Sequence, residues 1–128
     1  MNGIEWVVDA QGCSSESLQD LERLRRLFDT LILDLHLRPV GATQWHQFPG
    51  SGGITGLCLL SESHLACHTF PEHGSLCLNV FCCVPRDVWN FQSHLEEMFS
   101  ATTVRIRAVE RSYSAEETVA SASGGRAQ

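Results

Sequence analysis

The sequence predicts an α+β fold, a two-layer α/β sandwich whose mainly antiparallel sheet is covered on one face by two helices. Two observations favour this fold. Two segments carry apolar residues at helical spacing, whereas several shorter segments are β-branched or alternate between apolar and polar residues. Over 128 residues these segments follow the order strand, helix, strands, helix, strand, and the length fits one domain.

The N-terminal part of the chain predicts one strand and one long helix. Residues 4–10 read Ile-Glu-Trp-Val-Val-Asp-Ala, a run rich in β-branched residues. Leucine recurs every three or four residues across 14–37, which is the spacing of an amphipathic helix that covers a sheet. Ser14 or Ser15 is the expected N-cap, and Pro39 follows the expected end.

The middle of the chain predicts four strands and two turns. We expect the strands at residues 40–48, 54–60, 61–69 and 75–83. The turns are a glycine-rich segment at 49–53 and the sequence Pro-Glu-His-Gly at 71–74.

A second helix and a last strand complete the predicted domain. Residues 85–87 (Pro-Arg-Asp) are suited to the first turn of a helix, and 102–109 alternate like a strand. From Ser112 onwards Ser, Ala, Glu and Gly dominate. We therefore expect a single domain at 1–111 and a flexible tail at 112–128. The apolar face of the second helix should hold Val88, Phe91, Leu95, Met98 and Phe99.

The composition limits the class of protein. Nine Lys and Arg against fifteen Asp and Glu give a net charge of −6, which argues against nonspecific nucleic-acid binding and favours cationic ligands. No apolar run approaches the roughly 18 residues of a membrane span, and no signal pattern opens the chain. We therefore expect a cytoplasmic protein without a membrane segment, whose six cysteines are reduced thiols.

Residues 61–74 concentrate reactive side chains, with three histidines, a cysteine and a serine that follows a glutamate. On a strand, His64 and His68 share one face. A zinc site with Cys83 is one interpretation, but the usual spacing of zinc ligands is missing, and we expect no metal. A cysteine hydrolase that uses Cys83 and His68, with Asn79 as the orienting residue, is another.

Alternation along residues 75–83 separates two adjacent cysteines. The even positions are apolar, so Cys82 is expected in the core. The odd positions are mixed, so Cys83 is expected to line a site. The alternative is that both thiols only fill the core.

Three motifs carry a resemblance to a known family. Residues 60–65 read Leu-Ser-Glu-Ser-His-Leu, 68–74 read His-Thr-Phe-Pro-Glu-His-Gly, and 79–83 read Asn-Val-Phe-Cys-Cys. At this spacing they resemble the motifs of the prokaryotic S-adenosylmethionine decarboxylases. The likeness extends over residues 4–110.

The resemblance implies a carboxy-lyase that makes its own cofactor. Ser63 would attack the carbonyl of Glu62, and self-cleavage between the two would give a β chain of 1–62 and an α chain of 63–128. The α chain would begin with a pyruvoyl group derived from Ser63. Its ketone would form a Schiff base with the substrate amine and accept electrons as CO₂ leaves. The product, decarboxylated S-adenosylmethionine, is the aminopropyl donor for spermidine synthesis.

The resemblance also implies roles for other residues. His68 matches a histidine that assists processing, and Cys83 matches the cysteine that returns a proton to the substrate carbon. Thr55 stands where the family usually has a serine that supports processing. Phe48 is a candidate for stacking on adenine or for a cation–π contact with the sulfonium. Glu72 matches a carboxylate of the family and is expected at the rim of the site or in its turn.

Three positions depart from the family pattern, because Asn79 replaces Asp, Cys82 replaces Thr and Thr55 replaces Ser. Loss of a carboxylate at 79, on the face expected to meet substrate, would change which cationic group is favoured. The alternatives are therefore an ornithine or arginine decarboxylase of the same pyruvoyl type, or an uncleaved, non-catalytic paralogue. The family implies a homodimer of cleaved protomers, or a higher assembly, with sites near the interface.

Overall fold

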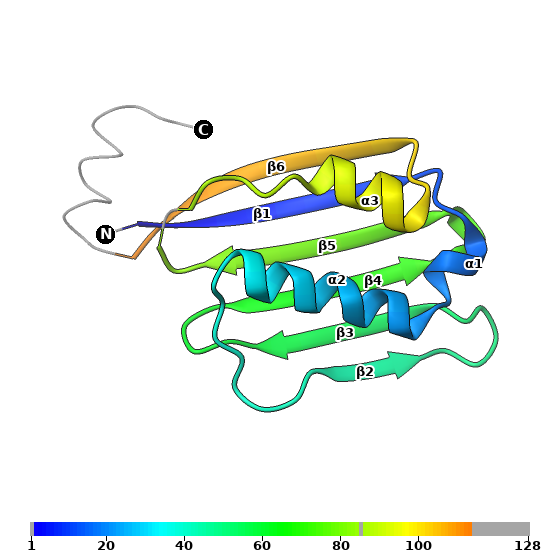
Figure 1. Ribbon diagram of the computed structural model, residues 1–128, viewed down its shortest axis with the longest axis horizontal. Coiled ribbons are helices and arrows are strands. Elements are labelled where there is room, and N and C mark those ends of the chain that lie inside the picture. Colours follow the sequence, from blue (N-terminus) through cyan, green and yellow to red (C-terminus); the bar gives the residue numbers. More distant parts are fainter. Residues whose placement is uncertain (1, 85, 114–128) are drawn as a thin grey trace.

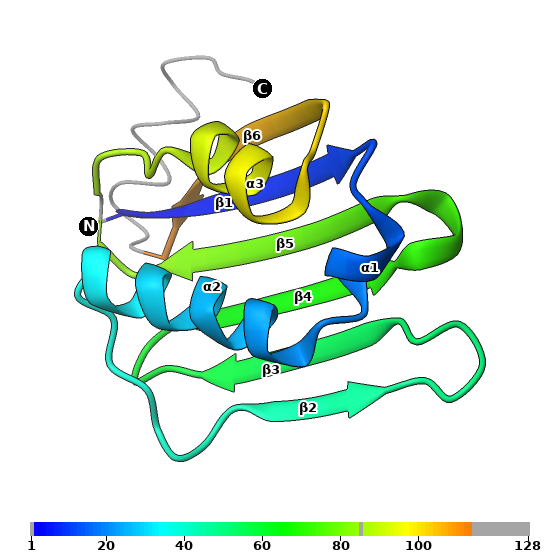
Figure 2. The same cartoon turned by 45° about the vertical axis from the view of Figure 1, so that its right-hand side comes forward.

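The computed structural model describes residues 2–84 and 86–113, which form a six-stranded antiparallel sheet in the order β2-β3-β4-β5-β1-β6. The strands are β1 Asn2–Gln11, β2 Gln44–Gln47, β3 Ile54–Leu59, β4 His64–Phe70, β5 Ser75–Cys82 and β6 Thr103–Ser112. The helices are α1 Ser15–Leu18, α2 Leu21–Asp34 and α3 Phe91–Phe99, with a 3-10 turn η1 at Pro71–His73. All three α-helices lie over the same face of the sheet (Figures 1 and 2), which confirms the predicted α+β sandwich.

The helix boundaries differ from the prediction because polar side chains start two of the helices at residues that the sequence did not predict. The helix predicted at 14–37 is two helices: Ser14 caps α1, as predicted, but the carboxylate of Asp20 accepts a hydrogen bond from the backbone N–H of Arg23 and so starts α2. The helix predicted to open at 85–87 begins later. There the side chain of Asn90 accepts from the backbone N–H of Ser93 (3.0 Å) and caps α3.

Several strands also differ in their bounds. The strand predicted at 4–10 extends over Asn2–Gln11, and residues 61–63 of the strand predicted at 61–69 form a turn before β4. The strand predicted at 40–48 is reduced to β2, because Gly41 takes a positive φ of 76° and interrupts the extended backbone. The strand predicted at 102–109 continues to Ser112, since β6 pairs with β1 as far as Asn2. Ser112 therefore belongs to the sheet rather than to the predicted tail, and residues 114–128 of that tail lie outside the described residues.

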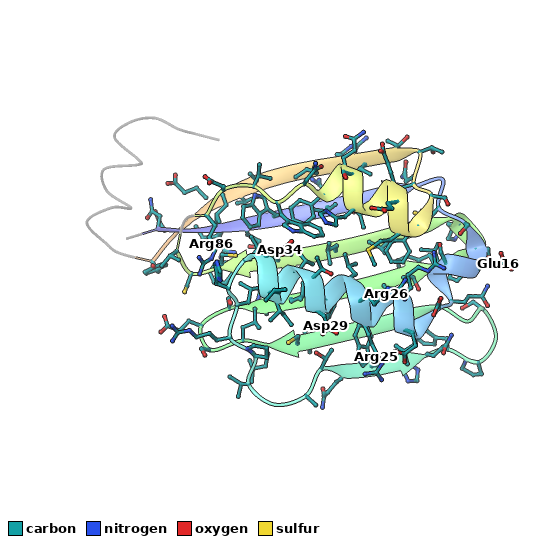
Figure 3. The ribbon with its side chains drawn as sticks, in the orientation of Figure 1. Glu16, Arg25, Arg26, Asp29, Asp34 and Arg86 are labelled. Atoms are coloured by element: carbon teal, nitrogen blue, oxygen red, sulfur yellow. The ribbon has the colours of Figure 1, made fainter. Side chains whose placement is uncertain are left out.

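One apolar core lies between the helices and the sheet. The outer surface of α2 carries charged side chains, among them Arg25, Arg26 and Asp29 (Figure 3). Within the described chain, no helix is both long and apolar enough to cross a membrane. The largest fully buried side chains include Trp6, Leu24, Leu27, Phe28, Leu31, Phe91 and Phe99.

The second face of the sheet, here called the open face, is not covered by any helix of the described chain (Figure 2). Four large apolar side chains lie exposed there: Leu57 is 49% exposed, Leu59 is 61%, Phe70 is 40% and Val109, opposite Glu5, is 43%. Apolar groups concentrated on one sheet face indicate a surface that binds another protein. Polar and aromatic residues that share this face are Glu5, Thr55, His64, His68, Asn79 and Phe81.

Candidate active site

The Glu62–Ser63 peptide lies in a tight turn between β3 and β4, at one end of the sheet. The backbone N–H of Leu60 donates to the carbonyl of Ser63 (3.1 Å), which closes the turn. The segment that follows α2 holds it from outside, because the N–H of Ser61 donates to the carbonyl of Arg38 (3.0 Å). The peptide expected to be cleaved is therefore fixed on both sides by backbone hydrogen bonds.

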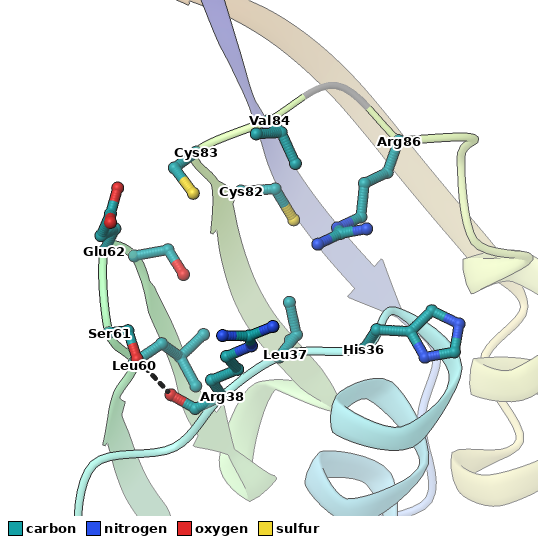
Figure 4. A pocket seen from close by; sticks show the side chains of 11 residues that line it. His36, Leu37, Arg38, Leu60, Ser61, Glu62, Cys82, Cys83, Val84 and Arg86 are labelled. Atoms are coloured by element: carbon teal, nitrogen blue, oxygen red, sulfur yellow. Dashed lines mark hydrogen bonds between the residues drawn. The ribbon is translucent and has the colours of Figure 1, made fainter.

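Beside this turn is a cavity of about 300 Å³, here called the Ser63 cavity (Figure 4). Its lining comes from the turn itself (60–63), from the segment after α2 (36–38) and from the end of β5 and the loop beyond it (82–84 and Arg86). The cavity therefore brings together Ser63 and Cys83, as the sequence predicted.

The two adjacent cysteines of this cavity differ in environment. Cys82 is 2% exposed, and burial raises the pKa of its thiol although Arg86 opposes the shift. Cys83 follows the end of β5, is half-buried, and accepts a hydrogen bond from the Tyr113 hydroxyl at its carbonyl (2.7 Å). The thiol of Cys83 is thus the more accessible of the two, in agreement with the alternation along β5.

A second cavity, here called the His68 cavity, lies on the sheet at the other end of β4 and measures about 730 Å³. Phe48, Thr55, His68, Phe70 and Glu72 are among its lining residues. The Thr55 hydroxyl and Nδ1 of His68 lie 3.0 Å apart, within hydrogen-bond distance. Four residues that the sequence singled out separately therefore meet in one place, and Phe70 adds a second aromatic side chain.

Ser63 and His68 do not meet within one chain. Ser63 immediately precedes β4, and His68, within β4, is the fifth residue after Ser63. At about 3.3 Å per residue, the strand separates the two by roughly 16 Å. The structure thus divides the predicted site into a half with Ser63, Glu62 and Cys83 and a half with Phe48, Thr55, His68 and Glu72.

Asn79 lines neither of these two cavities. Its amide nitrogen donates to a carboxylate oxygen of Glu5 (2.7 Å), and its amide oxygen lies 2.7 Å from Nε2 of His64. A carboxylate only accepts, so the Asn79 oxygen faces His64, and the imidazole must donate from Nε2. The pKa of Glu5 is lowered, mainly by the hydrogen bond from Asn79 and also by Arg111, against a smaller effect of burial. Asn79 therefore orients His64 on the open face.

The sequence does not indicate several residues that line a cavity or support Asn79. Arg38 and Arg86 line the Ser63 cavity, and Glu5 and Arg111 support Asn79 from β1 and β6. These contacts join segments far apart in the chain, and no local pattern could indicate them. Across residues 2–84 and 86–113, no three His, Cys, Asp or Glu side chains are grouped in a way that could bind a metal ion.

The sequence is similar to known proteins over most of its length. A family model described as S-adenosylmethionine decarboxylase matches residues 4–112. An S-adenosylmethionine decarboxylase proenzyme of Moorella thermoacetica is 32% identical over 106 residues, covering 82% of this chain and 83% of that protein. One of Pelotomaculum thermopropionicum is 33% identical over 101 residues, covering 78% of this chain and 79% of its own length.

The fold is also found in a solved structure. The crystal structure of the adenosylmethionine decarboxylase from Aquifex aeolicus is similar with a TM-score of 0.75 and 23% identity. The similarity covers 89% of this chain and 93% of that one.

Proposed function

The chain belongs to the S-adenosylmethionine decarboxylase family, and we propose that it is a self-cleaving, pyruvoyl-dependent enzyme of this kind. It would decarboxylate S-adenosylmethionine in the cytoplasm and supply the aminopropyl donor for spermidine synthesis. The observation that carries the proposal is the position of Ser63, which follows Glu62 in a fixed turn and shares a cavity with Cys83. The relatives are themselves named proenzymes, in keeping with a chain that must be processed.

Self-cleavage between Glu62 and Ser63 gives a β chain of 1–62 and an α chain of 63–128. Ser63 Oγ attacks the carbonyl of Glu62, the residue before it. The backbone hydrogen bonds of the turn hold this peptide in place. The pyruvoyl group that results would supply an electron-withdrawing ketone, which would accept the electron pair of the bond that breaks as CO₂ leaves. Because it is made from Ser63 itself, it needs no separate binding site.

Cys83 holds the proton that the substrate carbon receives after CO₂ has left. Its half-buried thiol lines the same cavity as Ser63, which supports this assignment. Cys82 lines the cavity too, but its side chain is only 2% exposed, so it is less available to a substrate than Cys83.

The complete site is formed by two copies of the chain, each contributing one half. In this arrangement Ser63 and Cys83 of one protomer face Thr55 and His68 of the other. The strand length that separates the halves supports this proposal, because His68 cannot reach the Ser63 of its own chain. The exposed apolar side chains of the open face supply the surface for such a homodimer.

The lining of the His68 cavity suits an aromatic cation. Phe48 and Phe70 offer ring faces for adenine or for the sulfonium, and the Glu72 carboxylate offers the opposite charge. S-Adenosylmethionine has both features. The alternative substrates, ornithine and arginine, rest on the replacement of an acid by Asn79, but Asn79 contacts Glu5 and His64 and lines neither cavity.

Intact-mass analysis of freshly purified protein tests the cleavage, and a CO₂-release assay tests the substrate. We expect two chains divided after Glu62, and release of CO₂ from S-adenosylmethionine in preference to ornithine or arginine. Ser63→Ala is the matched control, since it should abolish both cleavage and activity. A wild-type chain that stays intact after long incubation would instead support the uncleaved paralogue.

A further inference from the structure

Two arginines converge on the Ser63 cavity from different parts of the chain. Arg38 follows α2, and Arg86 follows β5. Both side chains line the cavity, and Figure 4 shows the guanidinium group of Arg86 beside Cys82 and that of Arg38 beside Leu37. Among the described residues neither arginine has an ion-pair partner within 4.0 Å. The Nε atom of Arg86 is buried without a hydrogen-bond partner.

Two like charges in one cavity repel each other unless an anion lies between them, and a buried N–H without a partner costs free energy. Both features therefore indicate an anion site. Asp34 and Asp87 line an adjoining pocket that Arg86 also borders, but the carboxylate of Asp34 accepts a hydrogen bond from Nε1 of Trp89 (2.8 Å). Among the residues described, Glu62 is the one acidic residue that lines the Ser63 cavity itself.

We propose that Arg38 and Arg86 bind the carboxylate that self-cleavage creates at Glu62. The inference rests on the proposed function. After the acyl group of Glu62 has moved to Ser63 Oγ, a base removes the α-proton of residue 63, and the released electron pair forms the Cα–Cβ double bond. The Cβ–O bond breaks, and its electron pair leaves on the new Glu62 carboxylate. Two guanidinium groups at this place stabilise the leaving group as its charge develops.

The connection between the turn and Arg38 favours this anion over the carboxylate of the substrate. The backbone N–H and the hydroxyl of Ser61 both approach the carbonyl of Arg38, at 3.0 and 3.4 Å. The residue that precedes Glu62 is therefore held against the backbone of Arg38 before any substrate enters. Moreover, a cation bound to the substrate carboxylate would oppose decarboxylation, because the negative charge that it stabilises leaves that group as neutral CO₂ forms.

The test follows cleavage of the full-length proenzyme by intact mass for Arg38→Gln, Arg86→Gln and the double variant. We expect the cleavage rate to fall about tenfold or more in each single variant and further in the double variant, which is the usual effect of removing a hydrogen bond to a charged group. Arg38→Lys and Arg86→Lys, which keep the charge, should retain more of the rate. Arg26→Gln is the matched control, because Arg26 is exposed on α2 and lines neither cavity.

A second measurement separates the proposal from a general loss of folding. Once fully cleaved, the Arg86→Gln protein should melt at a lower temperature than the cleaved wild type. In the uncleaved Ser63→Ala background, where no new carboxylate exists, Arg86→Gln should change the melting temperature much less. An equal change in both backgrounds would show that Arg86 has only a structural role and would overturn the proposal.

Two other results also overturn it. One is a double variant that is cleaved as fast as the wild type. The other is normal cleavage with a raised KM for S-adenosylmethionine, which would assign the arginines to the substrate carboxylate. A wild-type chain that is never cleaved would overturn the proposed function together with this inference, whereas the two results above leave the proposed function intact.

Discussion

Two inactive variants that damage different halves of the site should restore cleavage when they are combined. Ser63→Ala removes the precursor of the pyruvoyl group, and His68→Ala removes the processing histidine. Roughly 16 Å of strand separates these residues within a chain, whereas proton transfer requires about 3 Å. In a mixed dimer, the intact Ser63 of one chain therefore meets the intact His68 of the other.

The size of the effect follows from the pairing. Equal amounts of the two chains give about half mixed dimers, each with one intact site of two, so about a quarter of wild-type activity should return. In the mixed dimer only the His68→Ala chain is cleaved, because it alone keeps Ser63. Co-expression with two different tags allows intact-mass analysis to identify the cleaved chain, and CO₂ release measures the activity.

The control combines Ser63→Ala with Cys83→Ala. Ser63 and Cys83 line the same cavity of one chain, so no pairing creates a site in which both are intact, and CO₂ release should not return. The reasoning is refuted if the His68→Ala chain stays uncleaved in mixed dimers, or if the control pair recovers as much activity as the test pair.

Other predictions concern single residues. The Cys83→Ala protein should still be cleaved but lose decarboxylase activity, whereas the Cys82→Ala protein should keep most of that activity. CO₂ release by the two cleaved proteins measures this difference. Thr69→Val removes a buried hydroxyl that donates to Leu18 O (2.7 Å) and accepts from Ile54 N (2.8 Å), so urea unfolding should show a loss of about 1–3 kcal/mol. Asn79→Asp places a second carboxylate against Glu5. At neutral pH it should lower the free energy of unfolding by about 1–3 kcal/mol, again measured by urea unfolding. The pKa of Glu5 is lowered in the folded state, so its contribution to stability is present above its unfolded pKa and is lost as pH falls through the folded pKa. Glu5→Gln should therefore reduce the dependence of stability on pH in that acidic range, as measured by urea unfolding at several pH values.

Local periodicity was enough to predict the layers of this fold. The leucine spacing predicted the helical segment that covers the sheet. Alternation along β5 predicted a buried face that holds Leu76, Leu78, Val80 and Cys82. The same alternation, with the motif at 79–83, anticipated that Cys83 would be the accessible thiol. The helix boundaries were wrong because single side chains, Asp20 and Asn90, decided them.

The sequence predicts the candidate site less well than the fold, because residues that are close in sequence can lie far apart in space. Residues 61–74 form one dense motif, but a strand is extended, so its two ends cannot reach the same point. Arg38 and Arg86 were not predicted as site residues, since only the tertiary fold brings the end of α2 beside the end of β5. Asn79 was expected to face substrate, but its position opposite Val7 of β1 puts it within reach of Glu5.

The division of the site between two cavities links processing to assembly. A chain that has folded but remains alone has Ser63 in its fixed turn and His68 in the far half of β4, so under the proposed mechanism it would keep the scissile peptide intact. Pairing through the exposed apolar side chains of the open face would supply the missing histidine and start cleavage. The reactive ketone would then be formed only where the second half of the site already covers it, which limits its exposure to other amines. Under this arrangement the length of one strand is enough to delay formation of the cofactor until the enzyme has assembled.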